Sequence, residues 1–173
     1  MYAHELYRWL RGILALALTL AGALMSAAQS PPQPGVAYPE GFRSWQHVRS
    51  DLVGPAHASF PNRGGFHHFY ANGTAIEGYR TGRFSNGSVL VDEGVLAKDG
   101  EDKAKGMLLE GERRGIDVMV KDERLYKDTG GWGFEHFNGT DRAGTLSSAA
   151  RGKCFACHGT QVARDSVFGA IRP

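Results

Sequence analysis

The chain has 173 residues, of which 42% are hydrophobic and 22% are charged, and its formal net charge is +2. This length favours one domain, and the hydrophobic content is too high for a disordered chain. Because 20 Lys and Arg residues are nearly balanced by 18 Asp and Glu residues, we expect no nucleic-acid partner. The 24 glycines favour many turns over long helices, and two cysteines are too few for a disulfide-stapled scaffold.

The N-terminal segment, residues 1–28, has the three parts of a secretory signal peptide: a basic flank, a short apolar core and a small-residue exit. The apolar run, Gly12–Met25, is shorter than the roughly 20 residues that a membrane-spanning helix needs. We therefore expect cleavage near Ala28 and a periplasmic or secreted mature protein, with an uncleaved membrane anchor as the alternative. Residues 29–40 predict a proline-rich, extended linker, and residues 41–173 form the predicted domain.

Short runs of strand-forming residues, separated by turns, make up most of the predicted domain. Val89, Val91 and Val95 share one face, as alternate residues of a strand do, and Asn-Gly, a dipeptide that favours turns, recurs along the chain. The predicted strands cover residues 44–48, 66–70, 88–97, 107–121 (with a turn near Gly111 or Gly115) and 131–137.

Helical character is confined to two places. Residues 74–79 predict one short helix, capped by Asn72 or Thr74, and helical character returns after Leu146. The predicted fold class is therefore α+β: a mainly antiparallel β-sheet with short helices, and a C-terminal helical segment that carries the cysteines.

The sequence Cys154-Phe155-Ala156-Cys157-His158 is the attachment signature of c-type haem. On a helix, positions i, i+3 and i+4 share a face, so the two thiols and the imidazole are presented together. The thiols can form thioethers with the haem vinyl groups, and the imidazole can bind the iron. We therefore expect one covalently attached c-type haem, bound by Cys154 and Cys157, with His158 as the proximal iron ligand.

Three other interpretations of this motif remain. A thioredoxin-like redox couple needs a preceding strand in a βαβ unit, and none is predicted here. Structural zinc usually takes four ligands, whereas the motif supplies three. A plain disulfide between Cys154 and Cys157 leaves His158 without a role.

The position of the motif near the C-terminus bears on the sixth iron ligand, because residues 159–173 contain no methionine. The remaining candidates are Met107, Met119, His47, His57, His67, His68 and His136. We expect these side chains to be structural or exposed and the sixth position to be open or occupied by water. An open iron binds small ligands, whereas a closed one mainly carries electrons.

Six stretches of the chain form an ordered set: Phe42–Trp45, His68–Asn72, Thr81–Val89, Asp117–Asp122, Gly131–Phe134, and Cys154–His158 with Asp165–Phe168 after it. Together they resemble the cytochrome P-460 family and its relatives, the beta-type cytochromes c-prime, over Gly41–Pro173. The resemblance implies a mainly antiparallel β fold, one covalent haem on His158 and a distal pocket open to small nitrogen oxides. Founding members oxidise hydroxylamine and carry a lysine cross-linked to the haem, whereas the c-prime relatives lack that link and bind nitric oxide or carbon monoxide.

Asp92 stands where the resemblance places the cross-linking lysine. A carboxylate cannot form the same nitrogen-to-carbon bond, and Lys98, Lys103 and Lys105 are poor substitutes by register. The distal carboxylate of the family falls on Asp117, which is then a candidate catalytic residue. Burial in an aromatic pocket would raise the pKa of Asp117 toward the range useful for relaying protons, and an exposed strand aspartate is the alternative.

Aromatic and polar neighbours of the haem are expected from the same resemblance. We expect Trp132 and Phe134 to pack in the haem pocket, and Asp165 or a backbone carbonyl to accept the free ring N–H of His158.

Three functions follow from these expectations. The first is a periplasmic mono-haem protein that binds or converts nitric oxide or hydroxylamine, and is thus a candidate oxidoreductase. The second is a hydroxylamine-oxidising enzyme of the cross-linked type, against which Asp92 argues. The third is a six-coordinate electron carrier. The expected partners are the small-molecule ligand, a periplasmic electron-transfer protein and, in a candidate homodimer, a second copy of the chain.

Overall fold

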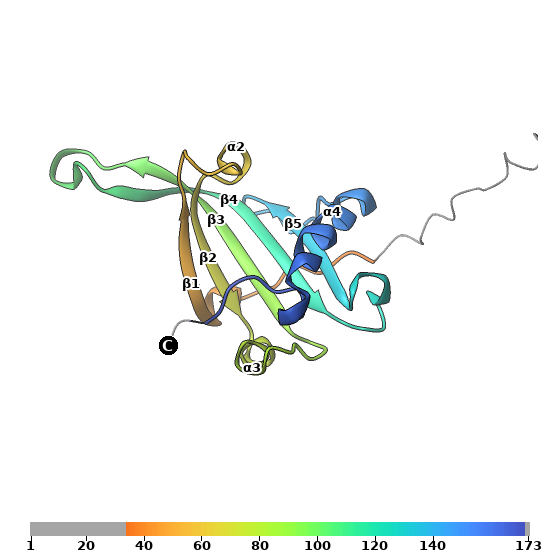
Figure 1. Ribbon diagram of the computed structural model, residues 1–173. Helices are drawn as coiled ribbons and strands as arrows, with labels where there is room; N and C mark the ends of the chain where they lie inside the picture. Colours follow the sequence, from red (N-terminus) through yellow and green to blue (C-terminus); the bar gives the residue numbers. More distant parts are fainter. Residues whose placement is uncertain (1–33, 172–173) are drawn as a thin grey trace, which may run out of the picture. The chain divides into compact units, whose positions relative to one another are not determined.

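The computed structural model of the chain describes residues 34–171, so the predicted signal peptide and the first part of the proline-rich segment lie outside the described residues. Within them, five strands form one antiparallel sheet in the order β1-β2-β3-β4-β5 (Figure 1). The strands are β1 (Gln46–Val53), β2 (Gly65–Ala71), β3 (Val89–Asp99), β4 (Leu108–Lys121) and β5 (Trp132–Asn138). The prediction of a mainly antiparallel α+β fold is confirmed.

Strand β4 is continuous over 14 residues, so the prediction of a turn near Gly111 or Gly115 is wrong. Gly115 pairs with Gly94 on β3 and has a φ of +155°, next to an irregular stretch of the pairing. A Cβ on Gly115 would lie 2.3 Å from the carbonyl oxygen of Phe137, so glycine lets the strand pass through this distortion instead of ending there. Beyond it, β3 and β4 project as a long arm, closed by the 3-10 helix η2 (Asp102–Ala104) and coloured green in Figure 1.

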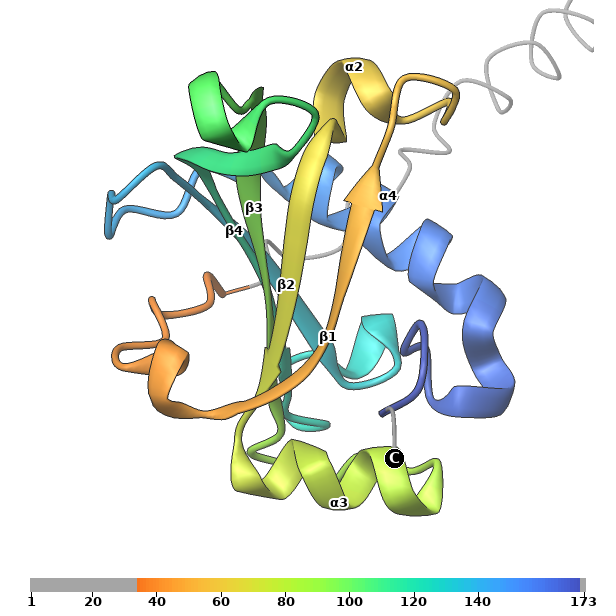
Figure 2. The ribbon, with the colours of Figure 1, turned by 90° about the vertical axis from the view of Figure 1, so that its left-hand side faces the viewer.

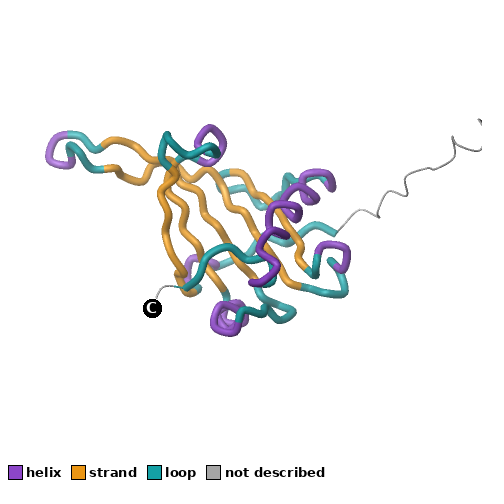
Figure 3. The backbone as a smooth tube through the Cα atoms, in the orientation of Figure 1, coloured by secondary structure: helices purple, strands orange, loops and turns teal. Residues whose placement is uncertain are grey.

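The helices of the described chain lie around the sheet (Figure 3). Besides η2, they are α2 (Phe60–Arg63), α3 (Gly73–Thr81), α4 (Ser148–His158) and the 3-10 helices η1 (Phe42–Ser44), η3 (Lys127–Thr129) and η4 (Gly159–Arg164). The predicted cap of α3 is confirmed, because Oδ1 of Asn72 accepts the N–H of Ala75 at 2.9 Å. Between residues 34 and 171, no helix has both the length and the apolar character to cross a membrane.

The two faces of the sheet carry separate apolar clusters, because successive strand residues point to opposite sides. The face that we call the α4 face is covered by α3, α4 and the C-terminal segment. Its buried residues are Val48, Ala71, Ala75, Phe84, Leu90, Met119, Trp132, Phe134 and Val167. The opposite face buries Val36, Phe42, Val91, Ile116, Val118, Tyr126 and Phe137. Figure 2 shows the blue C-terminal part on one side of the sheet and the orange segment before β1 on the other.

The segment before η1 belongs to the packed domain. Val36 is 7% exposed within the cluster on the opposite face, and Tyr38 packs against the same cluster. Tyr38 also makes an edge-to-face contact with Phe137 on β5, with ring centroids 5.1 Å apart. The packed domain therefore includes residues ahead of Gly41, where the predicted domain begins.

Candidate functional site

Helix α4 presents Cys154, Cys157 and His158 from one stretch of its surface, as their spacing predicts. The helix lies along β5 on the α4 face (Figures 1 and 2). Cys154 is partly buried against the apolar cluster of this face and Cys157 is exposed, and both are free thiols. Burial raises the pKa of the Cys154 thiol, so it is protonated at neutral pH.

The imidazole of His158 is held in one orientation. Its Nδ1 lies 2.9 Å from the carbonyl oxygen of Ser166, which can only accept, so Nδ1 carries a proton. Burial lowers the pKa of His158, although the Ser166 carbonyl acts in the other direction, and the neutral ring is therefore favoured. In that neutral ring the lone pair is on Nε2. This is the tautomer that a metal-binding imidazole needs, with its second nitrogen bonded to an acceptor.

Both aromatic residues predicted to pack against haem lie on the α4 face. The ring centroids of Phe134 and His158 are 5.3 Å apart, and those of Phe168 and His158 are 5.0 Å apart. Trp132 is fully buried in the apolar cluster and donates from Nε1 to the carbonyl oxygen of Asp165 at 2.8 Å. The wall beside His158 is thus aromatic, which suits a flat, apolar ring system.

Among the candidates for a sixth iron ligand, Met119, His67 and His136 lie on the α4 face, whereas Met107 and His68 lie elsewhere. Met119 is 8% exposed and packs in the cluster of the α4 face, whereas Met107 is 56% exposed near the tip of the β3–β4 arm. His68 points to the opposite face of the sheet, where its Nδ1 lies 2.7 Å from Oγ of Ser50. His67 and His136 belong to a polar group on the α4 face.

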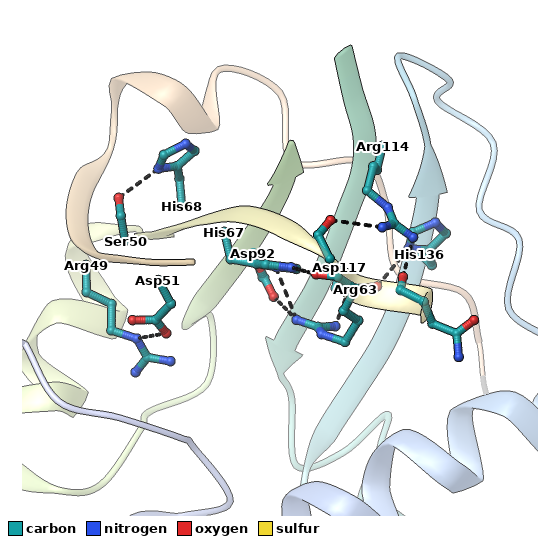
Figure 4. A network of polar contacts seen from close by, with 12 residues as sticks. Arg49, Ser50, Asp51, Arg63, His67, His68, Asp92, Arg114, Asp117 and His136 are labelled. Atoms are coloured by element: carbon teal, nitrogen blue, oxygen red, sulfur yellow. Dashed lines mark hydrogen bonds and ion pairs between the residues drawn. The ribbon is translucent and has the colours of Figure 1, made fainter. Parts of the chain in front are cut away.

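This polar group centres on two aspartates. The register pairs Asp92 on β3 with Asp117 on β4, and Asp117 with His136 on β5, so all three side chains share the α4 face. Arg63, at the end of α2, reaches between the carboxylates: Nη1 donates to Oδ2 of Asp117 at 3.0 Å, and Nη2 donates to Asp92 (Figure 4). We call Arg63, His67, Asp92, Asp117 and His136 the polar cluster.

His67 is buried at the Asp92 end of the polar cluster, with 5% of the residue exposed. Its Nδ1 lies 2.8 Å from Oδ1 of Asp92, and its Nε2 lies 2.8 Å from the carbonyl oxygen of Arg63. Both nitrogens thus face acceptors, which the doubly protonated ring satisfies. Burial alone would lower the pKa of His67, but the hydrogen bond and charge of Asp92 outweigh it and the pKa is raised.

His136 has the same relation to Asp117 at the other end of the cluster. Its Nδ1 lies 2.7 Å from Oδ1 of Asp117, and its Nε2 lies 3.1 Å from Oδ1 of Asn138. The hydrogen bond to Asp117 is the main reason that the pKa of His136 is raised, and burial opposes it. The pKa of His136 is therefore higher than that of an ordinary histidine.

The prediction of a raised pKa for Asp117 is wrong. Burial alone would raise the pKa of this carboxyl, but the hydrogen bond with His136 and the charge of Arg63 outweigh it, and the pKa is lowered. Asp117 also remains 47% exposed at its side chain. It therefore stays ionised, and it holds the imidazole of His136 instead of exchanging a proton itself.

A cavity of about 210 Å³ opens beside the polar cluster. It is lined by Asn62, Arg63, His67, Gly94, Arg114, Gly115, Asp117, His136 and Asn138. The cysteines and His158 are not among these residues, but the charges of Arg63, Asp117 and Asp92 act on the pKa of His158. The polar cluster and the cysteine–histidine motif thus both belong to the α4 face.

Sequence reasoning missed Arg63 and Lys121, and it expected a backbone acceptor for His158 without naming Ser166. Arg63 lies in a short helix that was not predicted and is 54 residues from Asp117. Ser166 acts through its backbone carbonyl, for which residue type carries no signal; the expectation of "Asp165 or a backbone carbonyl" included this outcome. The lysine at position 121 continues the alternation of β4, and that alternation could have placed it on the face of Asp117.

The pair of His136 and Asp117 gives a stability prediction with a defined pH window. The raised pKa of His136 stabilises the folded state below about pH 6.5, and this contribution is lost as pH rises through the raised value. The lowered pKa of Asp117 stabilises the folded state above about pH 3.8, and this contribution is lost as pH falls through the lowered value. We expect His136→Gln to cost about 1 kcal/mol or less at pH 5, because the pair is partly exposed, and almost nothing at pH 9. Urea unfolding of the holo-protein at both pH values measures this.

The matched control is His57→Gln, because His57 lies in the loop before α2, outside the polar cluster. The difference between the costs at pH 5 and pH 9 should be larger for His136→Gln than for His57→Gln. An equal cost of His136→Gln at the two pH values would show that the pair is not ionised as described.

Comparison with known protein families adds a finding that geometry alone does not give. The family model of Cytochrome P460 matches residues 39–169. The chain belongs to the Cytochrome P460 family. It is thus a haem-binding cytochrome, as the resemblance in its motifs implies. No curated protein matches the chain.

The residues on α4 fit a haem of this cytochrome. Two free thiols and an imidazole lie on adjacent turns of one helix, and the imidazole already has its Nδ1 proton bonded to Ser166. Phe134, Phe168 and the apolar cluster around Cys154 offer the ring system an apolar contact surface. Residues 34–171 thus offer a haem two thiols, an imidazole for its iron and an apolar surface for its ring.

Proposed function

We propose that this Cytochrome P460 family member is a periplasmic c-type cytochrome with one haem. Cys154 and Cys157 would hold the haem through thioethers, and Nε2 of His158 would bind the iron as proximal ligand. The observation that carries the proposal is the hydrogen bond from His158 Nδ1 to the Ser166 carbonyl. His158 lies on the same helix as both free thiols. The hydrogen bond commits the imidazole to the tautomer whose Nε2 can donate to iron.

We further propose an open sixth position that takes small nitrogen compounds, of which nitric oxide and hydroxylamine are the expected examples. Bound haem iron supplies one-electron chemistry and a coordination position for such ligands. The placement of Met107 on the projecting arm and of Met119 in the apolar cluster supports the absence of a methionine ligand.

The polar cluster would serve this site by holding and exchanging protons. Asp117 stays ionised and fixes the Nδ1 proton of His136, while Nε2 of the same ring faces Asn138 at the cavity. The pKa of His136 is raised, so its ring can hold a proton and pass it on as a general acid or base does. Arg63 donates to both carboxylates, and its positive charge helps to keep Asp117 ionised.

The cross-linked, hydroxylamine-oxidising type of site finds little support on the α4 face. Asp92 is committed to Arg63 and His67, and it carries no amine. Lys121 does lie on this face, but its Nζ is 2.8 Å from Oδ1 of Asp165 and 3.0 Å from the carbonyl oxygen of Gly130. We therefore propose a haem without a lysine link, served by a periplasmic electron-transfer partner.

Optical spectroscopy of the purified holo-protein tests the proposal. We expect a high-spin ferric spectrum of ordinary c-type character that changes on titration with nitric oxide. A low-spin spectrum that does not respond to nitric oxide would contradict the open site and leave an electron carrier. A band shifted far to the red would instead indicate a cross-linked haem.

A further inference from the structure

The turn that supplies the acceptor for His158 is an unusual piece of backbone. Asp165 and Ser166 are consecutive non-glycine residues with positive φ, +50° and +64°. Side chains disfavour this region, so such a pair persists only where its surroundings hold it. The Ser166 carbonyl accepts from His158 Nδ1 at 2.9 Å, so the orientation of the imidazole depends on this turn.

The turn is held by a buried ion pair. Nζ of Lys121 on β4 donates to Oδ1 of Asp165 at 2.8 Å, and the two side chains are 4% and 16% exposed. The same ammonium donates to the carbonyl oxygen of Gly130 at 3.0 Å and lies 5.1 Å from the centroid of the Trp132 ring. Two contacts besides the ion pair, with Gly130 and Trp132, thus hold the lysine in place.

Asp165 is fixed through its other oxygens as well. Its Oδ2 accepts the N–H of Phe84 at 3.0 Å, and its carbonyl oxygen accepts Nε1 of Trp132 at 2.8 Å. Its side chain and main chain are therefore tied to the loop before β3, to β4 and to β5. The ion pair joins the rigid sheet to the residue directly before Ser166.

We propose that Lys121 and Asp165 are positioning residues for His158: the buried pair holds the Asp165–Ser166 turn so that the Ser166 carbonyl stays bonded to Nδ1. This inference rests on the proposed function, in which Nε2 of His158 binds the haem iron. A carbonyl acceptor on the second nitrogen fixes the ring and makes it a stronger electron donor to a metal. The hydrogen bonds of Lys121 and Asp165 described above go to neither the imidazole nor the polar cluster, so the pair acts through the turn.

Two variants of the holo-protein test the pair. Lys121→Met keeps the apolar stem and removes the ammonium; Asp165→Asn is nearly isosteric and removes the carboxylate charge. In each we expect a downward shift of the iron–histidine stretching frequency in the ferrous resonance Raman spectrum and a higher haem midpoint potential. The double variant should shift both no further than the larger single effect, because the two residues act as a unit.

The matched control is Arg113→Met, which removes a buried cation from Glu93 on the opposite face of the sheet; those side chains are 14% and 3% exposed. It should lower stability without moving the stretching frequency or the potential. If Lys121→Met and Asp165→Asn likewise lower stability but leave the stretching frequency and the potential unchanged, the pair is merely structural and the inference is overturned. If Lys121→Met does not fold, Asp165→Asn decides.

The wild-type spectrum separates this inference from the proposed function. If the wild-type protein shows no iron–histidine band, the ferrous iron is not five-coordinate with a histidine ligand, and the proposed function with its open sixth position fails together with the inference. If the band is present and unmoved in the folded variants, the inference alone fails.

Discussion

A Cys154→Ser/Cys157→Ser double variant should release all of its haem into acidified organic solvent, whereas the wild-type protein should keep its haem on the polypeptide. The reason is chemical: serine hydroxyls do not form the thioethers that the proposal assigns to the two thiols on α4. The variant keeps His158 and its bond to the Ser166 carbonyl, so it can still bind haem, but only through the iron. Extraction followed by absorbance of both phases measures the loss.

The single variants Cys154→Ser and Cys157→Ser serve as controls, because each retains one thiol and should keep its haem covalently bound. Wild-type protein that gave up its haem to the solvent as readily as the double variant would contradict covalent attachment. Retention of haem by the double variant would show that other residues attach it.

An Arg151→Met variant should lower the free energy of unfolding by about 3 kcal/mol. Arg151 on α4 forms an ion pair with Glu135 on β5 and donates from Nε to the carbonyl oxygen of Phe134 at 3.2 Å. Glu135 is 2% exposed at its side chain, so removing the cation leaves a buried carboxylate without its charge partner. Methionine keeps the apolar stem, which limits the loss to the polar part. Urea unfolding of the holo-protein at pH 7 measures the effect.

The effect of Arg151→Met should also depend on pH. Burial alone would raise the pKa of Glu135, but the hydrogen bond from Arg151 outweighs it and the pKa is lowered. The pair therefore stabilises above about pH 4.5, and its contribution is lost as pH falls through the lowered value. Lys153→Met, an exposed charge removal on the same helix, is the control and should cost little at any pH. Equal costs for the two variants would mean that the pair does not anchor α4.

The sequence was informative where the chemistry is local. Cys154, Cys157 and His158 are close in the chain, so their spacing alone predicted a shared helical surface, and alternation of valines predicted β3. The distortion at Gly115 was mistaken for a turn, because a glycine in a strand pattern indicates either a bulge or an end.

The polar cluster shows what the sequence could not provide. The pKa of Asp117 depends on Arg63 and His136, which come from a short helix and from the neighbouring strand. Only the register of β3, β4 and β5 places Asp92, Asp117 and His136 in one row, and register is a property of the folded sheet. Burial was correctly expected to favour the neutral carboxyl, but its charged partners were not visible in the sequence.

Denaturing mass spectrometry of the wild-type chain, produced in a periplasm that attaches haem, tests covalent haem attachment most directly. We expect the intact mass of the polypeptide plus one haem, with the added mass on the peptide that contains Cys154, Cys157 and His158. The bare mass of the polypeptide, with haem appearing only as a released molecule, would contradict a c-type cytochrome.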